Sequence, residues 1–299
     1  MTSPSVRAPI FQPDSFTATR FAGNPAAVVV LEQFLSDGSM QAIAAENNLA
    51  ETAFLVAAAA EHHLRWFTPT VEVKLCGHAT LATAAVVMER LDPGREKVVF
   101  QSMSGPLTVE RSGSRYVMDF PARPSKPVSL PAGLAEALGA VPVEIHLNSF
   151  NYLAVFANAD VVRNLLPDMN AIAQIKREGV IVTAPGDAPY DFTSRYFAPA
   201  KGIPEDPVTG GAHCMLTPYW AHRLGKADFV GFQASSRGGE VICGLRGDRV
   251  RLEGSCVFYR RRNTDLAPSR RIADSPSSPT PPNPAHAPKR RCNCSADAQ

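Results

Sequence analysis

The chain has 299 residues, of which 45% are hydrophobic and 19% are charged, and its net charge is +2. This composition is typical of a globular protein long enough for two domains of ordinary size. The small net charge gives no reason to expect a nucleic-acid partner, and no apolar run approaches the length that spans a bilayer. The first thirteen residues lack the pattern of a signal peptide. We therefore expect a cytoplasmic protein with no membrane partner.

The first predicted elements lead to an acidic residue at an element boundary. Residues 26–31 form a short apolar run after turn residues, which predicts a buried strand. Residues 40–47 carry a helical pattern that ends at Asn48, a residue typical of helix C-termini. Glu51 follows this stop and precedes the apolar run 53–56. We expect its side chain at an element boundary, from which it can enter a cleft.

Short strands are expected along the rest of both halves, because β-branched and aromatic residues recur in short runs. The runs are residues 64–67, 98–100, 107–109, 116–120, 152–156, 179–182, 241–245, 249–252 and 256–259. Four prolines within residues 121–131 indicate a linker, and a helix is expected at 134–138.

The predicted linker divides the chain into an N-terminal lobe of residues 1–122 and a C-terminal lobe of residues 123–262. Residues 263–299 are rich in Pro, Ser, Ala and Arg and have almost no large apolar side chains. Such a segment cannot bury enough surface to offset its ordering entropy. We predict that it is a disordered tail.

The six cysteines show no framework spacing, and in a cytoplasmic chain of this size they are expected to be free thiols. Cys292 and Cys294, with His286 upstream, form a single close pair. Zinc sites normally use two well-separated ligand pairs. We therefore predict no metal site.

The chain nearly repeats one of its own segments. Phe-Thr-Pro at 67–69 leads into Cys-Gly-His-Ala-Thr at 76–80, and Phe-Ala-Pro at 197–199 leads into Thr-Gly-Gly-Ala-His at 209–213. A run with helical character follows each glycine turn. Exposed N–H groups and the helix dipole favour negative charge at a helix N-terminus. The repeat thus suggests two facing anion sites, with a small carboxylate held between two lobes.

Each half also carries an acidic residue near its part of the repeat. Asp206 lies in the Glu-Asp-Pro segment just before the second turn, and Glu51 lies in the first half. Two carboxylates that meet at the lobe interface can move a proton. The alternative for either acid is a surface carboxylate or a helix cap.

Ordered motifs between residues 11 and about 259 resemble the phenazine-biosynthesis F (PhzF-like) isomerase family. They are FAGNPAAV at 21–28, LAETAF at 49–54, RWFTP at 65–69, LCGHAT at 75–80, YDF at 190–192, RYFAP at 195–199, GIPEDPVTG at 202–210, QAS at 233–235 and RGG at 237–239. The resemblance implies an α+β fold of the diaminopimelate-epimerase type. Such a fold has two pseudo-symmetric lobes, each a mixed sheet or barrel around a central helix, with the active site in the cleft between them.

The resemblance also implies roles for individual residues. The family's general acid/base glutamate matches Glu51, its histidine matches His78 and its Glu-Asp-Pro aspartate matches Asp206. We expect His78 to relay a proton or to hold a carboxylate, because its charge is tunable near neutral pH. Backbone N–H groups that bind the substrate are expected at Gly77, Gly210 and Gly211.

The sequence departs from the family pattern at two positions. The serine before the family glutamate is Ala50 here, and the serine that contacts substrate in the family is Gly211. A backbone N–H at residue 211 still allows anion binding. We therefore expect the polar groups of the substrate to differ from those of the phenazine precursor.

Other residues keep two interpretations. In the near-repeat Cys76 pairs with Thr209, so one half has a thiol and the other a hydroxyl. Racemisation by two thiols needs a second sulfur, and Cys214 lies too far into its helix. Cys76 is either part of the site or a buried packing residue. Arg195 is either a carboxylate-binding residue or part of an inter-strand salt bridge, and His213 is expected to be structural.

The sequence thus predicts a cofactor-independent isomerase that moves a proton within a small carboxylic acid, such as a dihydro-hydroxyanthranilate-like compound. Glu51 would act as the general acid/base. One alternative is an amino-acid racemase or epimerase on the same fold, and another is a catalytically idle relative that binds a small molecule. The expected partner is the small carboxylate substrate, and a homodimer is an assembly that the sequence leaves open.

Overall fold

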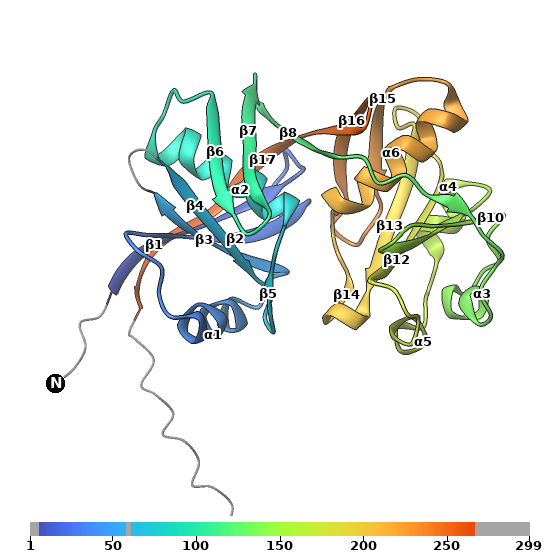
Figure 1. Ribbon diagram of the computed structural model, residues 1–299, viewed down its shortest axis with the longest axis horizontal. Coiled ribbons are helices and arrows are strands. Elements are labelled where there is room, and N and C mark those ends of the chain that lie inside the picture. Colours follow the sequence, from blue (N-terminus) through green and yellow to red (C-terminus); the bar gives the residue numbers. More distant parts are fainter. Residues whose placement is uncertain (1–5, 58–60, 267–299) are drawn as a thin grey trace, which may run out of the picture. The chain divides into compact units, whose positions relative to one another are not determined.

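A computed structural model describes the backbone of residues 6–57 and 61–266, which form two lobes built mainly of strands (Figure 1). In the first lobe, strand pairing runs in the order β1, β2, β3, β4, β6, β7, β8, β17 and returns to β1. The lobe is therefore a closed barrel of eight strands. Their bounds are β1 (Val6–Ser15), β2 (Asn24–Leu31), β3 (Glu51–Ala57), β4 (His62–Phe67), β6 (Lys97–Ser102), β7 (Gly105–Ser112), β8 (Arg115–Pro121) and β17 (Arg249–Leu266).

The second lobe repeats this order of pairing. The sequence of neighbours is β10, β11, β12, β13, β15, β16 and β17, and the parallel pairs β11–β12 and β13–β15 correspond to β2–β3 and β4–β6. The pseudo-symmetric α+β fold is thereby confirmed. The strands are β9 (Lys126–Pro127), β10 (Glu144–Leu147), β11 (Asn151–Val155), β12 (Gly179–Pro185), β13 (Phe192–Ala198), β14 (Ile203–Glu205), β15 (Asp228–Gln233) and β16 (Gly239–Arg246), and β5 (Glu72–Val73) is the counterpart of β14 in the first lobe.

Two strands connect the lobes. β8 and β17 pair with each other, and β17 then leaves β16 and pairs with β1 from Cys256 to Leu266. The pairing corrects the expected division in two respects. Residues 256–262 belong to the first barrel rather than to the C-terminal lobe, and residues 263–266 continue β17 rather than start a tail. The rest of the expected tail, 267–299, lies outside the described residues.

A buried helix passes through the centre of each lobe. In α2 (Gly77–Val86) every residue from His78 to Val86 is buried, and in α6 (Gly210–Leu224) most of the helix is buried as well. A helix that is apolar on all sides must be enclosed by protein, and here the barrel strands enclose it. The sequence predicts helical runs that start at Leu81 and at Met215. Both helices begin earlier, directly after Cys76 and Thr209. The glycine turns are therefore the first turns of the helices themselves.

Helix α1 (Asp37–Asn47) controls where β3 begins. The Ser36 side chain caps its N-terminus, and Asn48 ends it in the left-handed conformation, with φ 48° and ψ 40°. This confirms the predicted stop, and β3 starts three residues later at Glu51. The remaining helical segments are α3 (Leu134–Leu138), which was predicted, α4 (Ala159–Asn164), α5 (Met169–Ala173), the π-helical turn η1 (Val87–Leu91) and the short 3-10 turn η2 (Pro199–Lys201). Among the described residues no helix combines the length and apolar character needed to cross a membrane.

We expect a chain that ends at Leu266 to keep the melting temperature of the full chain, because residues 267–299 have too few apolar side chains to build a core. A chain that ends at residue 255 should instead lose its cooperative unfolding, since it lacks the half of β17 that closes the barrel against β1. Circular dichroism melts of both truncations test this pair of outcomes. A large loss of melting temperature in the chain that ends at Leu266 would show that residues 267–299 pack on the fold.

Candidate active site

The two central helices begin against each other. Cys76 and Thr209 precede the helices in extended conformation. A β-carbon built at Gly77 would lie 3.7 Å from the Cα of Gly210, and one built at Gly210 would lie 3.8 Å from the Cα of Gly77. The two helix starts therefore lie close together, at a spacing where an added β-carbon would be in ordinary van der Waals contact with the other backbone. The positive ends of two helix dipoles converge at the lobe junction.

Glu51 and His78 face each other beside this junction. Glu51 is the first residue of β3 and His78 is the second residue of α2, and Glu51 Oε2 lies 3.4 Å from His78 Nε2. The side chains are 13% and 4% exposed respectively. Neither of these two atoms has an aligned hydrogen-bond partner within the described residues. The pair is thus nearly enclosed, with its facing atoms free to engage a ligand.

Asp206 is held at the start of α6. Its Oδ1 accepts a hydrogen bond from Asn24 Nδ2 at 2.7 Å, and its Oδ2 accepts one from Thr209 Oγ1 at 2.6 Å. The Gln233 amide donates to the Asp206 carbonyl oxygen at 2.8 Å and accepts from the Thr209 N–H at 2.9 Å. The first two bonds restrain the carboxylate, and the two made by Gln233 restrain the main chain around it. The aspartate is therefore rigidly placed, not a mobile surface acid.

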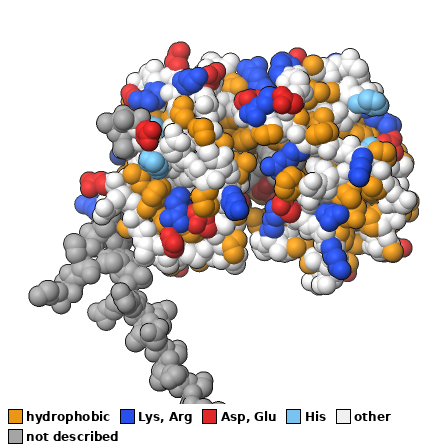
Figure 2. Space-filling model, in the orientation of Figure 1, with side chains coloured by type: hydrophobic (Ala, Val, Ile, Leu, Met, Phe, Trp, Pro, Cys, Tyr) orange, Lys and Arg blue, Asp and Glu red, His pale blue; other side chains and the backbone are white. Residues whose placement is uncertain are grey.

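The structure brings all three predicted acid/base residues into one cluster. Asn24 contacts both Asp206 and, at 3.1 Å, His78 Nδ1, and the charge of Asp206 acts directly on Glu51. Gly211 is exposed at the start of α6, and a β-carbon there would meet nothing within 4 Å. The space-filling view shows the surface hollowed between the two lobes (Figure 2).

Burial sets the protonation of the cluster. Desolvation, followed by the negative charge of Asp206, raises the pKa of Glu51 from its ordinary 4.5 to about 8. Burial also raises the pKa of Asp206, although hydrogen bonds from Thr209 and Asn24 oppose the shift. Desolvation lowers the pKa of His78 to about 3, so its imidazole is neutral at pH 7. Glu51 thus has the pKa of an efficient general acid/base near neutral pH.

Cys76 belongs to this cluster. Its side chain is buried, its Sγ lies 3.5 Å from His78 Nδ1, and its thiol is within hydrogen-bonding reach of Glu51. Burial and the neighbouring Glu51 charge raise the pKa of Cys76 well above its usual value. Donor atoms of Cys76, Glu51 and His78 lie within 4.8 Å of one another. The thiol therefore lies directly beside the facing Glu51–His78 pair.

The other predicted candidates have structural contacts. Arg195 makes a two-point ion pair with Glu205, at 2.8 and 2.9 Å. Arg65 and Glu72 form the same pair in the first lobe, at 2.6 and 2.7 Å. The inter-strand salt bridge is therefore the correct interpretation of Arg195. His213 is fully buried and its Nδ1 contacts the Thr209 carbonyl oxygen at 2.9 Å, as a structural role requires.

Sequence reasoning missed three residues that shape the site. Asn24 is one of the turn residues before the run 26–31, and the sequence pattern predicts no contact of Asn24, Thr209 or Gln233 with Asp206. Asn24 and Asp206 are 182 residues apart and belong to different lobes. A pairing of that kind has no local signal. The only hint was that all three residues lie within the motifs that carry the family resemblance.

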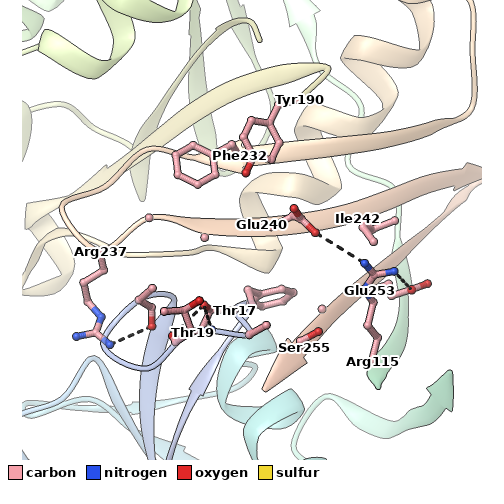
Figure 3. A pocket seen from close by; sticks show the side chains of 16 residues that line it. Thr17, Thr19, Arg115, Tyr190, Phe232, Arg237, Glu240, Ile242, Glu253 and Ser255 are labelled. Atoms are coloured by element: carbon pink, nitrogen blue, oxygen red, sulfur yellow. Dashed lines mark hydrogen bonds and ion pairs between the residues drawn. The ribbon is translucent and has the colours of Figure 1, made fainter. Parts of the chain in front are cut away.

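A cavity of about 500 Å³ lies outside this cluster (Figure 3). At one end Arg115 pairs with Glu240 and Glu253, at 4.0 and 3.5 Å. Arg237 lies at the other end. Leu252, the neighbour of Glu253 on β17, instead packs toward Gly210. Because successive strand residues point to opposite faces, β17 separates this cavity from the helix starts.

The family model described as phenazine biosynthesis-like protein (PhzC-PhzF) matches residues 13–262. The chain belongs to the PhzF family. An uncharacterized isomerase of Pseudomonas aeruginosa is 47% identical over 250 residues, which are 84% of this chain and 96% of the relative. The similarity thus extends over nearly the whole length of a relative that bears the name isomerase.

Solved structures agree with this assignment. A PhzF-family protein of Enterococcus faecalis has a TM-score of 0.84 and 40% identity, and the match covers 87% of this chain and 100% of that one. A hydroxyproline epimerase of Agrobacterium vitis has a TM-score of 0.59 at 10% identity, covering 87% of this chain and 93% of that one. The second likeness shows a shared fold only. The fold of this PhzF-family protein is therefore also that of epimerases.

Glu51→Gln should stabilise the folded protein at alkaline pH. A raised carboxyl pKa contributes stability that is complete below the unfolded value of 4.5 and is lost as pH rises through the folded value of about 8. The neutral amide avoids this loss. We expect a gain over wild type that grows between those pH values and reaches on the order of 1–3 kcal/mol.

Thermal or urea unfolding at a series of pH values measures the gain. Glu110→Gln is the matched control, because its side chain is 55% exposed and its ion pair with Lys97 lies at the surface. Parallel stability curves for wild type and Glu51→Gln would contradict a buried Glu51 with a raised pKa.

Proposed function

We propose that this PhzF-family protein is a cofactor-independent isomerase in which Glu51 moves a proton within a small carboxylic acid. The observation that carries the proposal is the cluster itself: a buried glutamate with a pKa near 8 faces a neutral histidine beside two converging helix N-termini. Such a group can both take and return a proton near neutral pH. The match to the family model and the similarity to a relative that bears the name isomerase support the same reaction class.

The helix starts provide the binding site for the substrate carboxylate. The first N–H groups of an α-helix have no partner within the helix. At the junction these groups come from Gly77 and His78 in α2 and from Gly210 and Gly211 in α6. Two positive dipole ends favour one negative group between them. A carboxylate bound there places the rest of the substrate next to Glu51.

The reaction then needs one base. Ionised Glu51 removes a proton from a carbon that is allylic or adjacent to the carboxylate, and the electron pair moves into the conjugated system. Protonated Glu51 returns the proton to another carbon on the same face, so the atoms and charge balance. Asp206 supplies the nearby negative charge that raises the proton affinity of Glu51. His78 stays neutral and holds a hydrogen near the carboxylate.

The two alternatives receive less support. A racemase needs a second base on the opposite face, and the residue opposite Cys76 in the repeat is Thr209, whose hydroxyl already donates to Asp206. A catalytically idle relative has no need for a glutamate with a pKa near the working pH. A dihydro-hydroxyanthranilate-like acid, a cytoplasmic location and a homodimeric assembly complete the proposal.

Glu51→Gln should reduce turnover by ~10²–10⁴-fold, the usual cost of losing a general base. The amide keeps the shape of the side chain, so binding of small carboxylates should change little. The assay is NMR of a panel of small unsaturated acids, including the dihydro-hydroxyanthranilate, in deuterated buffer. A rate within a few-fold of wild type would remove Glu51 from the mechanism, and unchanged biological effect without turnover would support the idle relative.

Gly211→Ser should change the preference among substrates more than it changes the action of the acid/base residues. The open space around residue 211 accommodates a serine side chain without a clash. One neutral hydrogen bond contributes ~0.5–1.5 kcal/mol, which is roughly tenfold in affinity at most. Comparison of kcat/KM for both forms over the same panel of acids tests this. A gain above a hundredfold on the dihydro-hydroxyanthranilate would show that Gly211 is more than a tuning change.

A further inference from the structure

The Asn24 side chain is fully buried where the two lobes meet. Asn24 is the first residue of β2 in the first lobe. Its Nδ2 contacts Asp206 Oδ1 at 2.7 Å and the Val208 carbonyl oxygen at 2.9 Å, both in the second lobe, and His78 Nδ1 at 3.1 Å in its own lobe. One amide nitrogen thus joins two members of the acid/base cluster across the junction.

The orientation of this amide follows from its neighbours. The Val208 carbonyl and the ionised Asp206 carboxylate can only accept hydrogen bonds. Rotation of the amide by half a turn would place Asn24 Oδ1 against these two acceptors. The nitrogen therefore faces them, and it also faces His78 Nδ1.

This orientation determines the tautomer of His78. An imidazole nitrogen that faces an N–H donor must act as the acceptor. His78 is neutral at pH 7, because burial lowers its pKa to about 3. Its single proton then lies on Nε2, the atom 3.4 Å from Glu51 Oε2. The histidine consequently carries its hydrogen on the nitrogen that faces Glu51, the residue proposed to take and return the substrate proton.

The Asn24 amide also has fewer N–H groups than it has acceptors nearby. It carries two N–H groups, while three acceptors lie within 3.1 Å of its nitrogen. When Asp206 is ionised it holds one of these hydrogens. The other hydrogen is shared between the Val208 carbonyl oxygen and His78 Nδ1. When Asp206 is protonated, or moves away with its lobe, the first hydrogen also becomes available to the histidine. The state of the acid in one lobe therefore changes the hydrogen bond received by the histidine in the other.

We propose that Asn24 is a positioning residue that holds His78 in the Nε2–H tautomer and couples it to Asp206 across the lobe junction. The proposal rests on the proposed function only for the task of Glu51. The tautomer and its link to Asp206 are properties of the resting protein.

The turn before Asn24 is built to keep the amide in place. Arg237, from the second lobe, donates to the Gly23 carbonyl oxygen and pairs with Asp14, both at 2.8 Å, and the Gly23 N–H donates to the Gly238 carbonyl oxygen at 2.7 Å. Gly23 has φ +65°, and a β-carbon there would lie 2.2 Å from the Ser15 carbonyl oxygen. The turn therefore requires glycine. Figure 3 shows Arg237 at the end of the 500 Å³ cavity that lies away from Arg115.

Other charged groups around the two titratable partners are few. In the first lobe they are Glu51 on β3 and Cys76 before α2. In the second lobe they are Lys201 on η2, Glu205 on β14 and Tyr196 on β13. None of them hydrogen-bonds to both His78 and Asp206 among the described residues, whereas Asn24 contacts both.

Imidazole ¹⁵N NMR tests the proposal without any substrate. The chain has seven histidines, and the His78 signals are assigned by their absence in His78→Gln. We expect wild type to show His78 with the proton on Nε2. Asn24→Ala should produce a mixture of tautomers. Asn24→Asp should favour the Nδ1–H tautomer, because a carboxyl oxygen in place of the amide nitrogen accepts from Nδ1.

Ser15→Ala is the matched control. Ser15 is fully buried and its hydroxyl donates to the main-chain oxygen of His78 at 2.9 Å. The control should lower the melting temperature and leave the tautomer unchanged, which separates positioning from general stability. A wild-type spectrum with the proton on Nδ1 overturns the proposal even if neither Asn24 variant folds. An unchanged Nε2–H tautomer in folded Asn24→Ala and Asn24→Asp overturns it as well, whereas failure of Glu51 in turnover would not.

Discussion

The contact between the starts of α2 and α6 is the constraint on which the site depends. The backbones meet at Gly77 and Gly210, and a β-carbon on either would lie within 4 Å of the other's Cα. A helix start leaves N–H groups without partners, so bringing two of them together creates a strong preference for an anion. The shared strands β8 and β17 hold the lobes in the arrangement that makes this contact.

Burial of polar groups at this contact shifts the pKa values of the two carboxyl groups. Removing a carboxylate from water disfavours its charged form. This desolvation is the main cause of the raised pKa of Glu51, and the negative charge of Asp206 adds to it. Asp206 is affected less, since Thr209 and Asn24 donate hydrogen bonds to it. Two acids in one cluster thereby acquire different proton affinities. The hydrogen bonds around each acid, rather than its residue type, thus separate the two pKa values.

The two lobes are pseudo-symmetric in their strands and differ in the side chains at their helix starts. The ion pairs Arg65–Glu72 and Arg195–Glu205 occupy equivalent places in the two lobes and maintain equivalent strand geometry. At the helix starts the equivalence ends, because one lobe has the thiol of Cys76 and the other the hydroxyl of Thr209. A site with different groups on its two sides suits transfer by one base. Identical groups would suit inversion at one carbon.

The sequence by itself determined the elements and the chemistry that depend on neighbouring residues. The near-repeat indicated two equivalent helix starts, and Asn48 marked the stop that places Glu51 at the head of β3, because capping and turn preferences are local. The motifs also indicated Glu51, His78 and Asp206 as members of one site.

Only the tertiary structure decided how those residues act on one another. The pairing of residues 256–266 with β1 and the Asn24 bond to Asp206 join segments far apart in the chain, and no local pattern encodes such contacts. The same holds for the salt bridge of Arg195 and for the raised pKa of Glu51. A pKa depends on what surrounds a group in space, and the surroundings exist only once the two barrels have closed around their helices.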